Sequence, residues 1–122
     1  MSDNEDRMLE AVSHGLTVAY TGLIATCAML PVPIALPEGL VSNLEAVPAV
    51  RRVTDIVDEQ PMPEAQHAML YTAATLWLAA MDLFDLLRVE FVEARAAGAI
   101  GILLTANDHL GDLGTWLLGE NG

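Results

Sequence analysis

The longest run of residues without charge covers positions 11–37, where no Asp, Glu, Lys or Arg occurs. A run of this length can form a helix that spans a bilayer, or the buried helix of a soluble domain. His14, Pro31 and Pro33 fit a membrane span poorly, and no cluster of basic residues closes the run. The sequence therefore favours a buried core helix, with a small integral membrane protein as the alternative.

Apolar and small residues recur in this region at spacings of three and four, which is typical of one helical face. That face comprises Leu9, Val12, Leu16, Ala19, Leu23 and Leu30. The capping-box pattern from Ser2 to Glu5 predicts that the helix begins at Ser2. Small flanking residues would allow another backbone to approach closely. They are Ser13, Thr17, Thr21, Gly22 and Ala25.

The segment at 30–39 contains three prolines, which remove backbone donors and favour extended conformations. We expect an extended apolar connector that packs over the core. A second capping-box pattern follows at 42–45, but Pro48 interrupts it. A short turn and then a helix over 48–59 resolves this conflict, because proline is tolerated in a first helical turn. Its apolar face would consist of Val50, Val53, Ile56 and Val57.

A break at 60–64 introduces a long helix predicted over 63–97. Its core positions are Met69, Ala73, Leu76, Ala80, Leu83, Leu87 and Phe91. Gly98 and Gly101 are expected to end or bend it, before a last helix over 103–118 with Leu110, Leu113 and Leu117 in register. The sequence thus predicts an all-α fold. It is a small bundle of three to four helices with a proline-rich extended connector, forming a single domain over residues 1–122.

The charge balance is strongly acidic, with 17 Asp and Glu against 5 basic residues and a net charge of −12. Such a surface repels nucleic-acid phosphate and anionic lipid headgroups, so direct nucleic-acid binding is not expected. The charge serves solubility or, alternatively, mimics nucleic acid towards a basic partner protein. The acidic N-terminus lacks the positive region of a secretory signal, and we expect a cytoplasmic protein.

One constellation has a specific chemical meaning: Glu64 and His67 form a Glu-x-x-His motif. Di-iron and di-manganese bundles use two such motifs together with two further glutamates. A symmetric dimer would supply the motif twice, and Glu10 could supply the remaining carboxylate from each chain. The alternative function is therefore an iron- or manganese-binding dimer with Glu10, Glu64 and His67 as ligands. The competing interpretation treats Glu64 and His67 as ordinary residues of a first helical turn.

Other reactive side chains lack partners in the sequence. His109 with Asp108 or Asp112 could act as a general base, but the pattern favours a solvated helix face with Asp108 and Asp112 one turn apart. Cys27 lies in an apolar helix, where a cysteine is typically buried and inert. No nucleophile or oxyanion donor is placed by the pattern, and we expect no catalytic site.

The leading functional hypothesis rests on apolar excess. Hydrophobic residues make up 53% of the chain, and a small domain cannot bury all of them in its own core. The surplus favours association through apolar helix faces. We expect a non-enzymatic accessory or regulatory protein that forms a homodimer, binds another helical or basic protein, or does both.

Overall fold

The structure is a computed structural model that describes residues 3–121, and no strand occurs among them. Four helices follow one another: α1 (Asp3–Met29), α2 (Asn43–Ile56), α3 (Glu64–Val89) and α4 (Glu93–Asn121). A 3₁₀ turn (Val57–Glu59) extends α2. The predicted all-α bundle is confirmed. The predicted cap at Ser2 lies outside the described residues.

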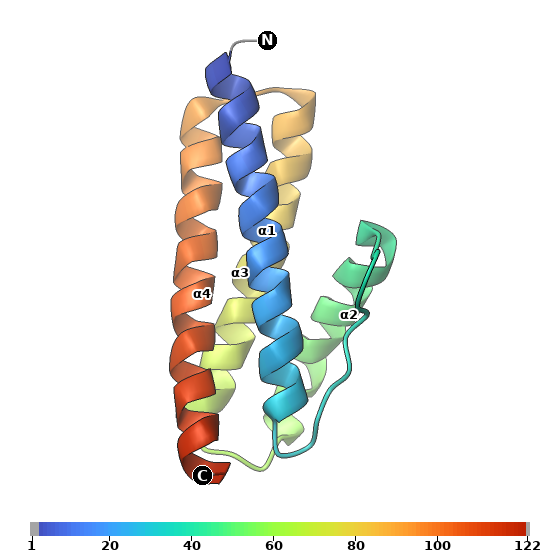
Figure 1. The fold of residues 1–122 in the computed structure, drawn as a ribbon, viewed down its shortest axis with the longest axis vertical. Helices are drawn as coiled ribbons and strands as arrows, with labels where there is room; N and C mark the ends of the chain where they lie inside the picture. Colours follow the sequence, from blue (N-terminus) through green and yellow to red (C-terminus); the bar gives the residue numbers. More distant parts are fainter. Residues whose placement is uncertain (1–2, 122) are drawn as a thin grey trace.

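The three long helices lie side by side, and the short α2 leans away from them (Figure 1). α1 and α4 run in the same direction, and α3 runs in the opposite direction. α4 packs along both α1 and α3, whereas α2 packs against α3. Within residues 3–121, the backbone of α2 does not come close to that of α1. The molecule is therefore a three-helix bundle to which a fourth, shorter helix is attached on one side.

The predicted apolar face is confirmed. Its members Val12, Leu16, Ala19, Leu23 and Leu30 are buried, and Leu9 is half-buried. The prolines after α1 produce the expected extended connector, in which Ile34 and Leu36 are buried. Two hydrogen bonds tie this connector to the turn before α3. The side-chain amide of Gln60 donates to the Val32 carbonyl at 2.7 Å and accepts from the Val32 amide at 3.0 Å. The connector is thus a fixed part of the fold.

The start of α2 differs from the prediction. The helix begins at Asn43, with Ser42 as an extended N-cap, and Pro48 lies inside it. Proline removes the hydrogen bond to the carbonyl four residues earlier, here that of Leu44. Leu44 is 88% exposed, so water can satisfy this carbonyl and the cost of the proline is small. The predicted inward face is confirmed for Val50, Val53 and Val57, with Ile56 half-buried.

The predicted helix over 63–97 is also wrong in its end point. α3 stops at Val89, and Glu90 adopts an extended conformation with φ −145° and ψ 114°. Gly98 and Gly101 lie inside α4, where the prediction placed a break. A glycine costs a helix only about 1 kcal/mol, and packing against two neighbouring helices outweighs that cost. Arg95 secures the new helix start by donating to the Glu90 carbonyl.

The buried face of α3 is rotated relative to the predicted one. Ala73, Ala80 and Leu87 are buried as expected, but Leu76 and Leu83 are only half-buried. The centre of the buried face also includes Leu70, Ala74, Trp77 and Met81. This rotation turns Trp77 towards α1, where it matters for the site described below.

α1 and α4 meet along a close seam at two glycines. A Cβ at Gly15 would lie 3.0 Å from Leu103 Cδ1, and one at Gly22 would lie 3.2 Å from Leu110 Cδ1. Both pairs are seven residues apart on each helix, as expected for two parallel helices in constant register. The predicted close approach at small residues is confirmed for Gly22.

Candidate functional site

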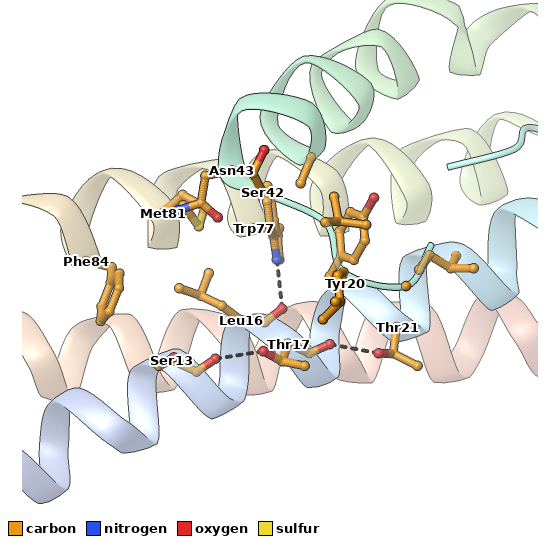
Figure 2. A pocket seen from close by; sticks show the side chains of 15 residues that line it. Ser13, Leu16, Thr17, Tyr20, Thr21, Ser42, Asn43, Trp77, Met81 and Phe84 are labelled. Atoms are coloured by element: carbon orange, nitrogen blue, oxygen red, sulfur yellow. Dashed lines mark hydrogen bonds between the residues drawn. The ribbon is translucent and has the colours of Figure 1, made fainter. Parts of the chain in front are cut away.

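A hollow of about 620 Å³ lies between α1, α3 and the start of α2 (Figure 2). It exists because α2 packs on α3 without reaching α1. α1 contributes Ser13, Leu16, Thr17, Tyr20, Thr21 and Ile24; α3 contributes Trp77, Met81 and Phe84; the segment entering α2 contributes residues 39–43 and Ala46. The volume falls within the roughly 300–1,000 Å³ typical of small-molecule sites.

Two aromatic rings form the centre of this hollow. The Trp77 indole N–H donates to the Leu16 carbonyl at 3.0 Å, which holds the ring between α1 and α3. The Tyr20 ring lies 5.5 Å from it, centroid to centroid, with a tilt of 40°. The Tyr20 hydroxyl donates to the Pro37 carbonyl at 2.8 Å. Both polar groups are thus used within the fold, and the half-buried Tyr20 ring, rather than the buried Trp77, offers apolar surface.

Hydroxyl groups line the α1 edge of the hollow, as Figure 2 shows. Thr17 donates to the Ser13 carbonyl at 3.2 Å, and Thr21 donates to the Thr17 carbonyl at 2.9 Å. Ser42 and Asn43 stand across from them at the start of α2, and the Ser42 side chain makes no capping hydrogen bond. The edge can therefore exchange hydrogen bonds with a neutral ligand.

No carboxylate, imidazole, thiol or guanidinium group belongs to this lining. Tyr20 is its only titratable residue. Burial, followed by the nearby acids Glu45 and Glu38 and the Cys27 thiol, raises the pKa of the Tyr20 phenol above its ordinary value. Tyr20 therefore stays neutral and occupied with Pro37.

The predicted metal ligands do not meet within one chain. Glu10 and Glu64 are exposed, and the beginnings of α1 and α3 lie at opposite ends of the bundle (Figure 1). His67 is half-buried, and its Nε2 donates to the Gln60 carbonyl at 2.7 Å. Over residues 3–121, no three His, Cys, Asp or Glu side chains gather as a metal site would require. A shared iron or manganese centre in a dimer stays a prediction, which metal analysis of purified protein tests.

The other reactive residues named from the sequence lie on the surface of α4 or in the core. Asp108 and Asp112 are exposed on α4 and His109 is half-buried beside them. Cys27 is fully buried, and burial raises the pKa of its thiol to about 12. A protonated, inaccessible thiol is not a nucleophile at neutral pH.

Two features of this region escaped the sequence reasoning. Gln60 looked like part of a break, yet its side chain and its carbonyl join Val32, Met62 and His67. Trp77 lies in the buried face of α3 and also lines the hollow from below. No local pattern marks either role, since both depend on partners that are distant in the sequence.

The comparisons with known proteins add no assignment. Neither a protein-family model nor a curated protein nor a solved structure matches the chain. By length and composition, α1 and α3 are apolar enough to cross a membrane, and 39% of the most apolar window of each is buried within the fold. A core helix of a soluble protein and, for the N-terminal α1, a signal sequence can have the same length and composition.

Proposed function

We propose that this protein acts by association, as a non-enzymatic homodimer in the cytoplasm, through one surface formed by α1 and α4. We call this surface the α1–α4 face. It consists of Ala11, His14, Val18 and Ala25 on α1 and Ala97, Ile100, Leu104, Asn107, Gly111 and Leu118 on α4. The observation that carries the proposal is that the groove between α1 and α4 on this face is lined by no Asp, Glu, Lys or Arg, in a chain of net charge −12.

Charge selects a second copy as the partner. Two chains of net charge −12 repel each other wherever their carboxylates approach. A contact between copies is therefore tolerated only where charges are absent, as on the α1–α4 face. A basic partner protein would instead dock on the acidic surfaces.

The shape of the face supports self-association. Leu104 and Leu118 are 60% and 66% exposed, and beside Leu104 a groove of about 240 Å³ runs between the helices. Val18 and Ile100 line the groove, with His14 and Asn107 as its polar groups. An isologous interface is self-complementary, so a side chain that projects from each chain can fit into the groove of the other chain.

The area of the face is that of a modest interface. The face spans residues 11–25 of α1 and 97–118 of α4, which are roughly 22 Å and 33 Å of helix. At a helix width of about 10 Å these two lengths present roughly 550 Å². A standard interface buries about 800 Å² on each partner, so a dimer through this face lies at the lower end of specific interfaces.

Sedimentation of the wild type and of Leu104→Asp tests this proposal. We expect the wild type to sediment as a dimer at micromolar concentration and Leu104→Asp as a monomer, because a buried unpaired carboxylate is costly. The matched control is Leu44→Asp, which adds the same charge at an exposed leucine on α2. A monomeric wild type, or equal dissociation by both substitutions, contradicts the proposal.

A further inference from the structure

We propose that the hollow between α1, α3 and the start of α2 is a binding site for a small aromatic amphiphile without negative charge. This site lies on the side of α1 that faces away from α4, so it is independent of the proposed dimer. The proposal concerns a ligand, and its first basis is the shape of the hollow. Three elements border it as an open groove, and its volume of about 620 Å³ lies within the roughly 300–1,000 Å³ of small-molecule pockets.

The lining defines the body of the ligand. Tyr20, Phe84 and Ile24 are half-buried and form the accessible apolar wall, and Trp77 and Met81 are buried beneath it. The indole N–H and the phenol O–H are bonded to backbone carbonyls and do not point to a ligand. The Tyr20 and Phe84 rings therefore favour a flat ring that stacks or packs edge-on, because aromatic pairs gain energy beyond the area they bury.

The edge of the hollow defines the polar part of the ligand. The hydroxyl groups of Thr17 and Thr21 donate to backbone carbonyls of α1, so towards a ligand their oxygens can only accept hydrogen bonds. Ser42 and Asn43 stand across the hollow with a hydroxyl and an amide that can donate. A ligand with a ring body and an edge that carries an N–H together with a carbonyl or ether oxygen satisfies both sides.

The absence of charge defines the ligand's own charge. The lining contains no Arg, and burying an anion without a cationic partner is strongly unfavourable. It contains no Asp or Glu either, but the carboxylates of Glu45 and Glu38 lie near enough to raise the pKa of Tyr20, and they further disfavour an anion. Neutral molecules are therefore selected over anionic analogues of the same size.

Two fluorescent probes with the same ring system test this selection. N-phenyl-1-naphthylamine is neutral, and 1-anilinonaphthalene-8-sulfonate carries an added sulfonate. In a Trp116→Phe background, Trp77 is the only tryptophan and reports directly from the hollow. We expect the neutral probe to quench Trp77 with a dissociation constant of about 100 µM or tighter, as its size allows. The sulfonated probe should bind at least about tenfold more weakly, because its charge loses hydration without a partner.

A pair of matched threonine variants locates the site. Thr17 and Thr105 are both exposed helical threonines whose hydroxyls donate to the carbonyl four residues earlier. Thr17→Glu places a hydrated carboxylate in the lining of the hollow, and Thr105→Glu places one on α4 outside it. We expect Thr17→Glu to weaken binding of the neutral probe at least about tenfold. Thr105→Glu should leave it unchanged, and so should Leu104→Asp, whatever that variant does to the dimer.

Three results would overturn the proposal: no quenching of Trp77 by the neutral probe, equal or tighter binding of the sulfonated probe, or equal effects of the two threonine variants. A melting curve of each variant accompanies the binding data. If Thr17→Glu loses its cooperative transition, Thr21→Glu, one turn further along the same edge, replaces it in the comparison.

Discussion

The two sides of α1 are both lined by small residues, yet one is closed and the other is open. Towards α4, Gly15 and Gly22 allow Leu103 and Leu110 to pack at 3.0–3.2 Å from where a Cβ would lie. Towards α2, Ser13 and Thr17 border a hollow of about 620 Å³. Residue size therefore does not decide whether a helix side is closed. What decides it is the presence of a helix that lies alongside for its whole length.

The lengths of the opposing helices explain the difference. α4 has 29 residues and follows α1 along its length in constant register. α2 has only 14 residues and packs on α3, because the connector at 30–39 carries it away from α1. Gln60 holds the connector in this position through Val32. The open side is thus a consequence of a short helix and a fixed connector.

The largest expected effect contrasts the two sides by truncation. Leu103→Ala should lower the free energy of unfolding by about 2–5 kcal/mol, because it leaves a cavity in the closed seam. Phe84→Ala removes a larger side chain but should cost less, since Phe84 is half-buried and faces an existing hollow. Urea denaturation of both variants measures the difference. A larger loss for Phe84→Ala would mean that the hollow is closed in solution.

A second comparison adds volume to each side. Gly15→Val should destabilise the fold by about 1–3 kcal/mol, because its Cβ alone meets Leu103 at 3.0 Å. Ser13→Val, two residues earlier on the same helix, faces the open side and should change stability by less than about 0.5 kcal/mol. Thermal melting of the two variants under identical conditions is the measurement. Equal losses would show that the seam is no tighter than the open side.

Much of the fold could be predicted because burial follows helical periodicity. The inward face of α1 and the face containing Val50 and Val53 both emerge from spacings of three and four. The break between α3 and α4 could not be predicted in the same way. The residues 90–92 contain neither Gly nor Pro, whereas Gly98 and Gly101 do not break α4. Tertiary packing on two helices overrides the weak local preference of glycine.

The candidate site was less accessible to sequence reasoning. Thr17 and Thr21 were noticed as small residues, but the pattern could not tell an open edge from a close helix contact. The hollow combines α1, α3 and the segment before α2, and its existence depends on the direction in which the connector leaves α1. The Glu64–His67 pattern is visible in the sequence. The distance between this pattern and Glu10 is not, because it depends on the topology of the bundle.

A third test uses pH to probe the closed core. Burial raises the pKa of the Cys27 thiol from 9.0 to about 12. The protonated thiol contributes fully to the free energy of unfolding below pH 9. This contribution is lost as pH rises towards 12, because the thiol of the unfolded chain loses its proton at a lower pH than the buried thiol does. The loss approaches about 1.4 kcal/mol per pH unit within this window. Tyr20, whose phenol pKa is also raised, adds to the loss above pH 10.

Denaturation of the wild type and of Cys27→Ala between pH 8 and pH 11 checks this expectation. The variant should be less stable at pH 8, since it leaves a small cavity, but its stability should fall less steeply with pH. Parallel curves for the two proteins would show that Cys27 is reached by water in the folded state. The core beside Tyr20 would then be more open to water than the burial of Cys27 indicates.

The smallest expected effect is the change in stability on replacing a glycine by alanine, which should differ in sign between Gly98 and Gly22. Gly98 lies inside α4 with nothing within 4 Å of a Cβ built on it. Gly98→Ala should therefore stabilise the fold by about 0.5–1 kcal/mol, because alanine loses less backbone entropy in a helix. Gly22→Ala gains the same helix preference but places a Cβ 3.2 Å from Leu110, so strain offsets the gain. We expect a higher melting temperature for Gly98→Ala and an unchanged or lower one for Gly22→Ala. An equal increase in both would mean that Leu110 moves aside without cost, and the seam would owe its closeness to helix length alone.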